Sequence, residues 1–280
     1  MDPLRRRQWV SRAAHGACGL SCLAALIPLA SLLLYVVFQG VRRLDLAFLT
    51  HLPRPVGVPG GGMANAIAGT LTMVAIASCI GLPIGVLAAV YLVEFGKNRL
   101  GATVRFTADV LSGVPSIVTG IFTYEILVKP LGGFSALAGG AALGFMMVPI
   151  VTRSTEELIR LVPGTLREAS LALGVTQWRT TLSIVLRTAQ GGILTGILLA
   201  GTRVAGETAP LLFTAFSNQF WATGLRQPTA SLTAQIYTLA ISPFDEWHDQ
   251  AWAGALLLLL LVLGAGLLAR TAFRSLGRVS

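Results

Sequence analysis

Long apolar runs dominate the pattern of hydrophobic and polar positions along this chain. Six of them approach or exceed the roughly 20 residues that a helix needs to cross about 30 Å of hydrocarbon. They are Cys18–Phe38, Ala64–Val93, Val110–Val128, Phe134–Val151, Gly191–Phe213 and Ala251–Ala269. The pattern therefore predicts an all-α polytopic membrane protein with six transmembrane helices and both termini on one side of the membrane.

Composition supports this assignment, and the charges predict an orientation. The chain has 280 residues, of which 54% are hydrophobic and 12% are charged, against about 25% charged in soluble domains. A net charge of +9 could suggest nucleic acid, but fifteen Lys and Arg residues lie on one side of the spans and five on the other. This asymmetry is the positive-inside pattern. It predicts cytoplasmic termini and no nucleic-acid partner.

One charged loop between two apolar runs carries the most specific motif. Residues 168–170 are Glu-Ala-Ser, Gly174 follows after three residues, and nine residues later comes Ile-Val-Leu-Arg at 184–187. This pattern resembles the EAA loop of ABC-importer permeases, in which Glu-Ala-Ala, Gly and Ile-x-Leu-Pro keep the same register. Ser170 and Arg187 depart from it. Because Arg187 replaces a proline, we expect the loop to continue into the next span without a bend.

The resemblance implies a type I ABC importer permease fold and a docking surface for an ATPase subunit. The coupling residues would be Glu168, Ala169, Leu173 and Gly174. A plainer interpretation is that Thr165 and Glu168 form a capping box and that Gly174 ends a short amphipathic helix. That interpretation leaves an apolar stripe uncovered in a loop between membrane spans, which favours a partner protein as its cover.

Four further segments narrow the resemblance to the phosphate-uptake permeases of the ABC superfamily. They are residues 62–71, 112–118, 206–215 and 235–237. The resemblance implies import of inorganic phosphate through the bacterial inner membrane, with contacts to membrane lipid, a second permease subunit, an ATPase dimer and an external phosphate-binding protein. Two alternatives remain: a permease for another oxyanion, such as molybdate, sulfate or phosphonate, and a gradient-driven carrier.

The chain carries no nucleotide motif that could make it an enzyme. Lys97 follows Gly96, but Tyr91 and Asn98 stand where a phosphate-cradling loop requires Gly and Ser or Thr. The cysteines and histidines have no metal-ligand spacing. We therefore expect no catalytic residue, cofactor or metal in this chain, and ATP hydrolysis on a partner subunit.

A single permease domain is predicted for residues 1–280. Residues 1–60 would form an N-terminal helix and an outside loop, and residues 61–270 the permease core with a cytoplasmic coupling loop at 153–188. No half of the sequence is duplicated, so we expect the second permease subunit to complete the translocation pathway.

Arg203, Glu207 and Thr208 are the candidates for the transport pathway. Arg203 lies twelve residues into the fifth apolar run, about 18 Å along a helix, where a charge costs about 2.5–3.5 kcal/mol on insertion scales. Glu207 follows one turn later and could pair with it. Pro210 would loosen the helix over 206–210 and free backbone N–H groups for an oxyanion. The alternative is a salt bridge that locks two permease subunits together.

Other features are expected to be structural. The patterns Gly81-x-x-x-Gly85 and Gly192-x-x-x-Gly196 allow helices to approach closely. Asp109 would cap the third span at its start. Glu125 and Lys129 are spaced for an ion pair within a helix.

Overall fold

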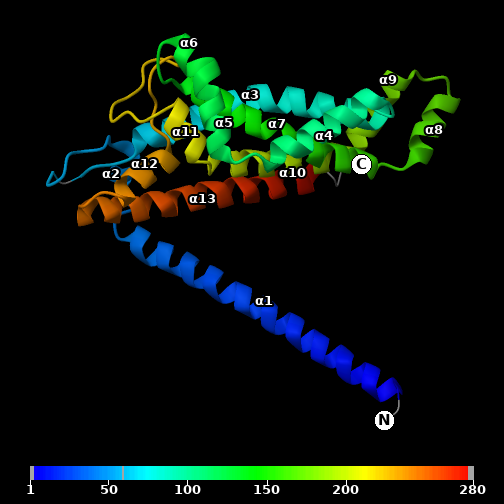
Figure 1. Ribbon diagram of the computed structural model, residues 1–280, viewed down its shortest axis with the longest axis horizontal. Coiled ribbons are helices and arrows are strands. Elements are labelled where there is room, and N and C mark those ends of the chain that lie inside the picture. Colours follow the sequence, from blue (N-terminus) through cyan, green and yellow to red (C-terminus); the bar gives the residue numbers. More distant parts are fainter. Residues whose placement is uncertain (1–2, 59, 277–280) are drawn as a thin grey trace.

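The computed structural model describes residues 3–58 and 60–276, and every regular element in these ranges is helical (Figure 1). The N-terminal half contains α1 (Pro3–Val41), α2 (Leu46–Thr50), α3 (Ala64–Glu94), α4 (Arg99–Gly113), α5 (Ser116–Thr123), the π-helical turn η1 (Tyr124–Val128) and α6 (Lys129–Leu131). The remainder contains α7 (Ala136–Arg160), α8 (Gly164–Ala172), α9 (Gln177–Thr180), the π-helical turn η2 (Thr181–Val185), α10 (Leu186–Ala205), α11 (Ala209–Thr214), α12 (Leu232–Ala240) and α13 (Asp245–Leu276).

The membrane-spanning elements agree with five of the six predicted runs. Five helices are long and apolar enough to cross, and a bent pair can supply a sixth span. The helices α1, α3 and α13 contain the first, second and sixth apolar runs, and α7 contains all but the first two residues of the fourth. The fourth run was the shortest, yet its helix continues to Arg160.

The third predicted span is not one helix. Helices α4 and α5 are bent by 103° at a short break, because Pro115 disfavours α geometry at the residue before it, and Val114 is extended with φ −68° and ψ 129°. Asp109 therefore lies inside α4, and its predicted role as a cap is wrong. Asn98 caps α4 instead, since its side-chain oxygen accepts a hydrogen bond from the Gly101 N–H at 2.9 Å.

The fifth predicted span has different boundaries from the run 191–213. One helix extends from Gln177 through η2 and α10 to Ala205. It passes Arg187 without a break, as the missing proline predicted. The chain then leaves helical geometry before α11 begins at Ala209, so the predicted loosening around 206–210 is confirmed. The predicted release of backbone N–H groups is wrong at Gly206 and Glu207, because these groups donate to the carbonyls of Arg203 and Val204 at 3.2 Å.

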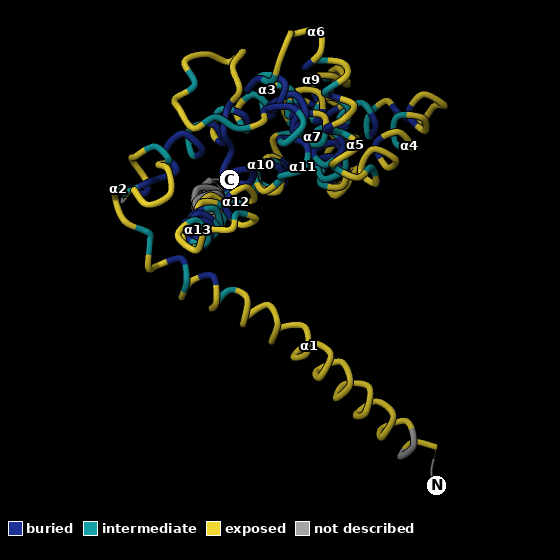
Figure 2. Tube along the Cα trace, turned by 60° about the vertical axis from the view of Figure 1, so that its left-hand side comes forward, coloured by how far each residue is buried: buried dark blue, intermediate teal, exposed yellow. Residues whose placement is uncertain are grey.

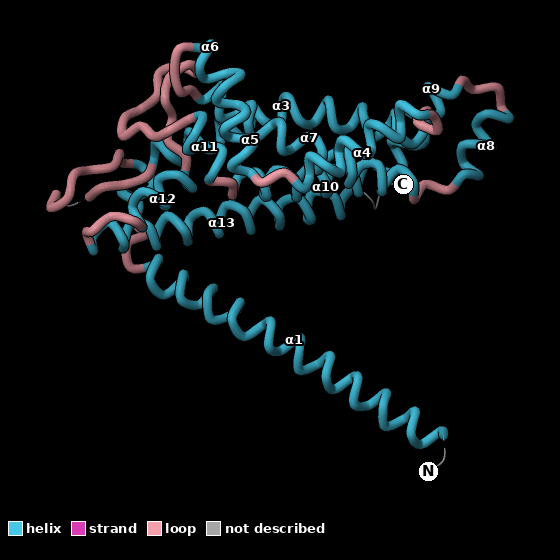
Figure 3. The backbone as a smooth tube through the Cα atoms, in the orientation of Figure 1, coloured by secondary structure: helices cyan, strands magenta, loops and turns pink. Residues whose placement is uncertain are grey.

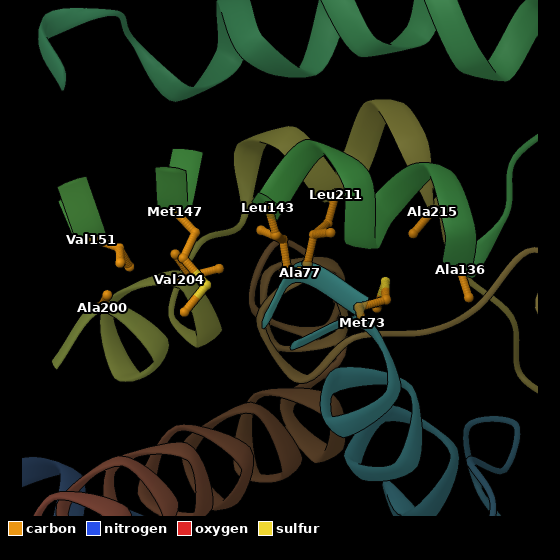
Figure 4. Close-up of a cluster of buried hydrophobic side chains, with 10 residues drawn as sticks. All are labelled: Met73, Ala77, Ala136, Leu143, Met147, Val151, Ala200, Val204, Leu211 and Ala215. Atoms are coloured by element: carbon orange, nitrogen blue, oxygen red, sulfur yellow. The ribbon is translucent and has the colours of Figure 1, made fainter. Parts of the chain in front are cut away.

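The centre of the bundle is α7, which contacts α3, α4, α5, α10 and α11. Its buried side chains join those of α3, α10 and α11 in the main apolar core (Figure 4). Glycines let α3 and α7 approach closely: a Cβ on Gly81 would lie 2.8 Å from the Met147 Cβ, and one on Gly140 would lie 2.6 Å from the Ile76 Cβ. The expected packing role of the glycine pattern at 81–85 is confirmed.

The second glycine pattern serves the other side of α7. A Cβ on Gly192 would lie 2.7 Å from a methyl carbon of Leu158, and one on Gly196 would lie 3.1 Å from the Ser154 hydroxyl. Glycines on α10 therefore face α7 as well, and the second pattern also has the expected packing role.

The two ends of the bundle differ. Loops, α2, α6 and α12 gather at one end, and α8 with α9 projects beyond the other (Figure 3). The start of α1 and the end of α13 lie toward the α8 end (Figure 1). Helix α1 diverges from the bundle and is exposed along most of its length (Figure 2).

The expected Glu125–Lys129 ion pair forms at 2.6 Å.

We predict that Gly140→Ala destabilises the fold. Alanine gains about 1 kcal/mol over glycine in helix propensity, but overpacking a well-filled contact typically costs about 1–3 kcal/mol. The melting temperature of the detergent-solubilised chain should therefore fall. Gly201→Ala is the matched control, because a Cβ on that α10 glycine meets no atom within 4 Å. Equal melting temperatures for the two variants would contradict the close contact of α3 with α7.

Candidate functional site

The coupling segment predicted from the motif is the helix α8. It begins after Pro163, and the structure records no side-chain hydrogen bond at its cap. Thr165 lies within the helix, so the predicted capping box is wrong, because the N-cap is Pro163, two residues before the position that the box requires. The predicted end is confirmed: Gly174 has φ 79°, and its N–H donates to the Leu171 carbonyl at 2.9 Å. The left-handed turn that favours glycine therefore closes α8.

The outer face of α8 is exposed. Glu168 and Ala169 are both exposed, and Leu173 is 85% exposed. No residue of α8 belongs to a buried apolar cluster among the described residues. We call Glu168, Ala169, Leu173 and Gly174 the coupling face. Apolar side chains that stand out from a loop of this kind suit a protein partner.

The inner face of α8 is held by polar contacts. Ser170, one of the two departures from the motif, is buried, and its hydroxyl lies 2.8 Å from the Thr180 hydroxyl. The guanidinium of Arg167 reaches Glu94 at the end of α3 with a 3.0 Å contact. Sequence reasoning counted Arg167 only as a cytoplasmic charge, since Glu94 is 73 residues away and nothing in the pattern links the two.

The pathway candidates border a cavity of about 420 Å³ between α4, α5, α7 and the end of α10. Its lining residues are Leu111, Ser112, Val114, Ser116, Met146, Ile150, Arg153, Arg203 and Glu207. Arg203 and Glu207 therefore face the same space. Thr208 precedes α11 at the helix break and is not among the lining residues.

Arg203 and Glu207 make no ion pair with each other among the contacts of the described residues. The expected pairing within the chain is therefore absent. Arg203 lies in the last turn of α10 and is exposed toward the cavity, and Glu207 is half-buried. The arrangement leaves the guanidinium donors of Arg203 available to an anion in the cavity.

Arg153 is a second cation of the cavity that sequence reasoning missed. It lies in α7, beyond the predicted end of that span at Val151, so it was counted only as a loop charge. Its Nε lies 3.0 Å from Asp109 of α4, and one terminal nitrogen lies 3.5 Å from Glu156. These carboxylates fix the position of Arg153 at the cavity wall.

Glu156 anchors the C-terminal part of α7. Its side chain is 1% exposed and accepts from three arginines, Arg105 at 2.6 Å, Arg160 at 2.5 Å and Arg153. Arg105 also donates to the Leu92 carbonyl at 2.6 Å. A buried carboxylate with several charge-assisted hydrogen bonds is well satisfied, so Glu156 connects α7 with α4 and with the end of α3.

Comparison with known proteins shows which family this chain belongs to. The family model of the inner membrane component of binding-protein-dependent transport systems matches residues 81–278. The phosphate transport system permease protein PstA of Yersinia pestis is 48% identical over 98% of this chain and 94% of its own. The chain belongs to this family of inner-membrane transport components. The probable protein of the same name from Methanocaldococcus jannaschii is 37% identical, with 88% and 87% covered.

Solved structures agree with the family at the level of the fold. A chain of the MetNI methionine ABC transporter in an inward-facing conformation has a TM-score of 0.61 and 19% identity, covering 76% of this chain and 96% of that chain. A chain of an amino acid ABC transporter has a TM-score of 0.58 and 18% identity, with 76% and 92% covered. The predicted type I importer permease fold is thus confirmed.

A permease of this family is one component of a larger transporter. Other permease and ATPase subunits belong to such an ABC importer. The exposed coupling face of α8 fits this position in an assembly. The cavity, whose lining residues come from several helices of this chain, fits it as well. The C-terminal residue Ser280, for which a cytoplasmic position is predicted, lies outside the described residues.

Proposed function

We propose that this chain is the membrane permease subunit of an ATP-driven importer for inorganic phosphate. The observation that carries the proposal is the agreement of names: relatives from organisms as different as Yersinia pestis and Methanocaldococcus jannaschii, matched over most of this chain, are phosphate transport permeases. The two arginines of the cavity support it, because guanidinium groups bind phosphate oxygens with good geometry.

In this proposal the chain works with a PstC-like permease, a PstB-like ATPase dimer and a PstS-like external phosphate-binding protein. Both termini and α8 face the cytoplasm. The positive-inside asymmetry supports that orientation, as does the position of the start of α1 and the end of α13 toward the α8 end of the bundle (Figure 1). ATP is held and hydrolysed by the ATPase dimer alone.

Transport follows from movement of the coupling face. When ATP closes the ATPase dimer, the α8 helix of this chain and its counterpart on the second permease move together, and the cavity opens outward to accept phosphate from the binding protein. Hydrolysis returns the helices and opens the cavity inward. Arg203 and Arg153 offer positive charge to the anion on its way.

Uptake of radiolabelled phosphate tests the substrate assignment. Proteoliposomes that contain the complete complex should take up phosphate in the presence of ATP and binding protein, and an excess of sulfate, molybdate or phosphonate should leave this uptake unchanged. Strong competition by one of these oxyanions would support the alternative permease. Uptake that needs an ion gradient but no ATPase subunit would contradict the importer itself.

We predict that Ala169→Asp uncouples transport from ATP. The substitution places an unpaired charge at the centre of the coupling face, where a partner would bury it, and such burial is costly. The chain should still insert, because α8 lies outside the spans. Phosphate uptake should fall at least about tenfold, given the 1.4 kcal/mol that a tenfold change requires, while protein levels stay normal. Wild-type uptake at normal protein levels would refute the docking assignment.

A second prediction separates the two roles of Arg203. If its charge lowers the barrier for phosphate, Arg203→Gln should abolish most uptake while the complex still assembles, and Arg203→Lys should retain part of it. If Arg203 instead balances Glu207 across the subunit contact, its removal strands a carboxylate, and Arg203→Gln/Glu207→Gln should restore both assembly and uptake. Recovery of uptake in the double variant would exclude the pathway role. Copurification and radiolabelled uptake provide the two measurements.

A further inference from the structure

The coupling helix is joined to the bundle by polar contacts. The apolar cluster nearest to it contains Ile159, Val162 and Val185, and no residue of α8 takes part. Without apolar burial, a displacement of α8 reaches the bundle only through the backbone and through hydrogen-bonded side chains. Two side chains of α8 make such contacts: Ser170 with Thr180 of α9, and Arg167 with α3, with the end of α7 and with the Val162 carbonyl just after it.

Arg167 uses all its guanidinium nitrogens on groups outside α8. Its Nε donates to the Glu94 carboxylate at 3.0 Å, and its two terminal nitrogens donate to the carbonyls of Val162 at 2.7 Å and Ile159 at 3.0 Å. The Arg167 side chain is 21% exposed and that of Glu94 is 8% exposed. These three contacts are short, largely shielded from water and made by a charged donor. They are therefore stronger than ordinary hydrogen bonds between neutral groups.

The acceptors lie at the cytoplasmic ends of two central helices. Ile159 is in the last turn of α7, whose final carbonyls lack partners within the helix and carry its negative end. Glu94 is the last residue of α3, and its carbonyl also accepts from Gln177 at the start of α9 at 3.2 Å. One guanidinium therefore holds α8 to α7 and α3 at the same time.

Of these two helices, α7 forms part of the cavity wall. The two helices pack against each other through the glycine contacts described above, and α7 supplies Met146, Ile150 and Arg153 to the cavity wall. A rigid contact between α8 and the end of α7 would move this wall with the coupling face.

We propose that Arg167 is the positioning residue that transmits displacement of the coupling helix to α7 and α3, and hence to the cavity. The inference rests on the proposed docking of an ATPase subunit on α8. A lysine cannot replace Arg167 fully, since a single ammonium cannot reproduce the planar fork that reaches three separate acceptors.

Folding of α8 itself does not depend on Arg167. The Ser170–Thr180 hydrogen bond fixes the helix to α9, and the left-handed turn at Gly174 closes its end. Removal of Arg167 should therefore leave the coupling face in place and loosen only its connection to the bundle. This separates transmission from docking.

The test uses the purified complex with its ATPase subunits in proteoliposomes and compares Arg167→Gln and Arg167→Lys with wild type. Arg179→Gln is the matched control, because it removes the same charge from the same loop while Arg179 only stacks on Trp178. Three quantities are measured: copurified ATPase subunit, phosphate imported per ATP hydrolysed, and thiol labelling at the cavity residue Ser112. The last uses Ser112→Cys with the native cysteines 18, 22 and 79 changed to serine, with and without vanadate-trapped nucleotide.

We expect Arg167→Gln to retain the ATPase subunit, to import roughly tenfold less phosphate per ATP, and to lose the change in Ser112→Cys labelling on nucleotide trapping. Arg167→Lys should fall between this variant and wild type, and Arg179→Gln should match wild type. A wild-type ratio and labelling change in Arg167→Gln would overturn the proposal. Loss of the ATPase subunit from Arg167→Gln would also overturn it, because Arg167 would then build the docking surface.

The labelling readout does not depend on the substrate. If the wild-type complex shows the nucleotide-dependent labelling change but imports no phosphate, the phosphate assignment fails, and the labelling of the Arg167 variants still decides the transmission role. If the wild-type chain binds no ATPase subunit, both proposals fail.

Discussion

The contact between α3 and α7 is the constraint on which the rest of the structure depends. Lipid tails are as apolar as the side chains of the helices, so no hydrophobic effect drives the helices together. Helices in a membrane are therefore held by close packing. Glycines at positions 81, 85 and 140 remove the side chains that would separate the two backbones. With α7 fixed in this way, α4, α5, α10 and α11 find their places around it, and the cavity forms where their polar residues meet.

The sequence predicted most spans because a long apolar run has few other solutions in lipid. Hydropathy alone did not predict the bend between α4 and α5, because a hydropathy average over many residues is hardly changed by one proline. Pro115 was the signal in the sequence that could have indicated the bend. Hydropathy also misplaced the ends of α7 and of the fifth span. A charged residue such as Arg153 or Arg187 ends an apolar run, but it has good helix propensity and does not end the helix. Hydropathy therefore indicates which residues can lie in hydrocarbon, and it does not indicate where the helix ends.

The sequence revealed local features of the candidate site and missed the contacts between distant segments. Glu168, Ala169 and Gly174 belong to one short motif, and the structure places the first two on the exposed face of α8 and Gly174 at the turn that ends it. The contacts of Arg167 with Glu94 and of Arg153 with Asp109 join segments far apart in the chain. No spacing rule in a single sequence reveals such pairs, since they follow from the packing of α3, α4 and α7.

The helix from Gln177 to Ala205 has a mechanical consequence. It contains 29 residues, which corresponds to about 44 Å of continuous helix. One end starts beside the coupling helix, and the other carries Arg203 into the cavity. A proline in place of Arg187 would divide this rod into two arms with a hinge. The undivided helix acts as a lever, so a tilt of about 5° about its end at Gln177 moves Arg203, about 39 Å away along the axis, sideways by roughly 3 Å.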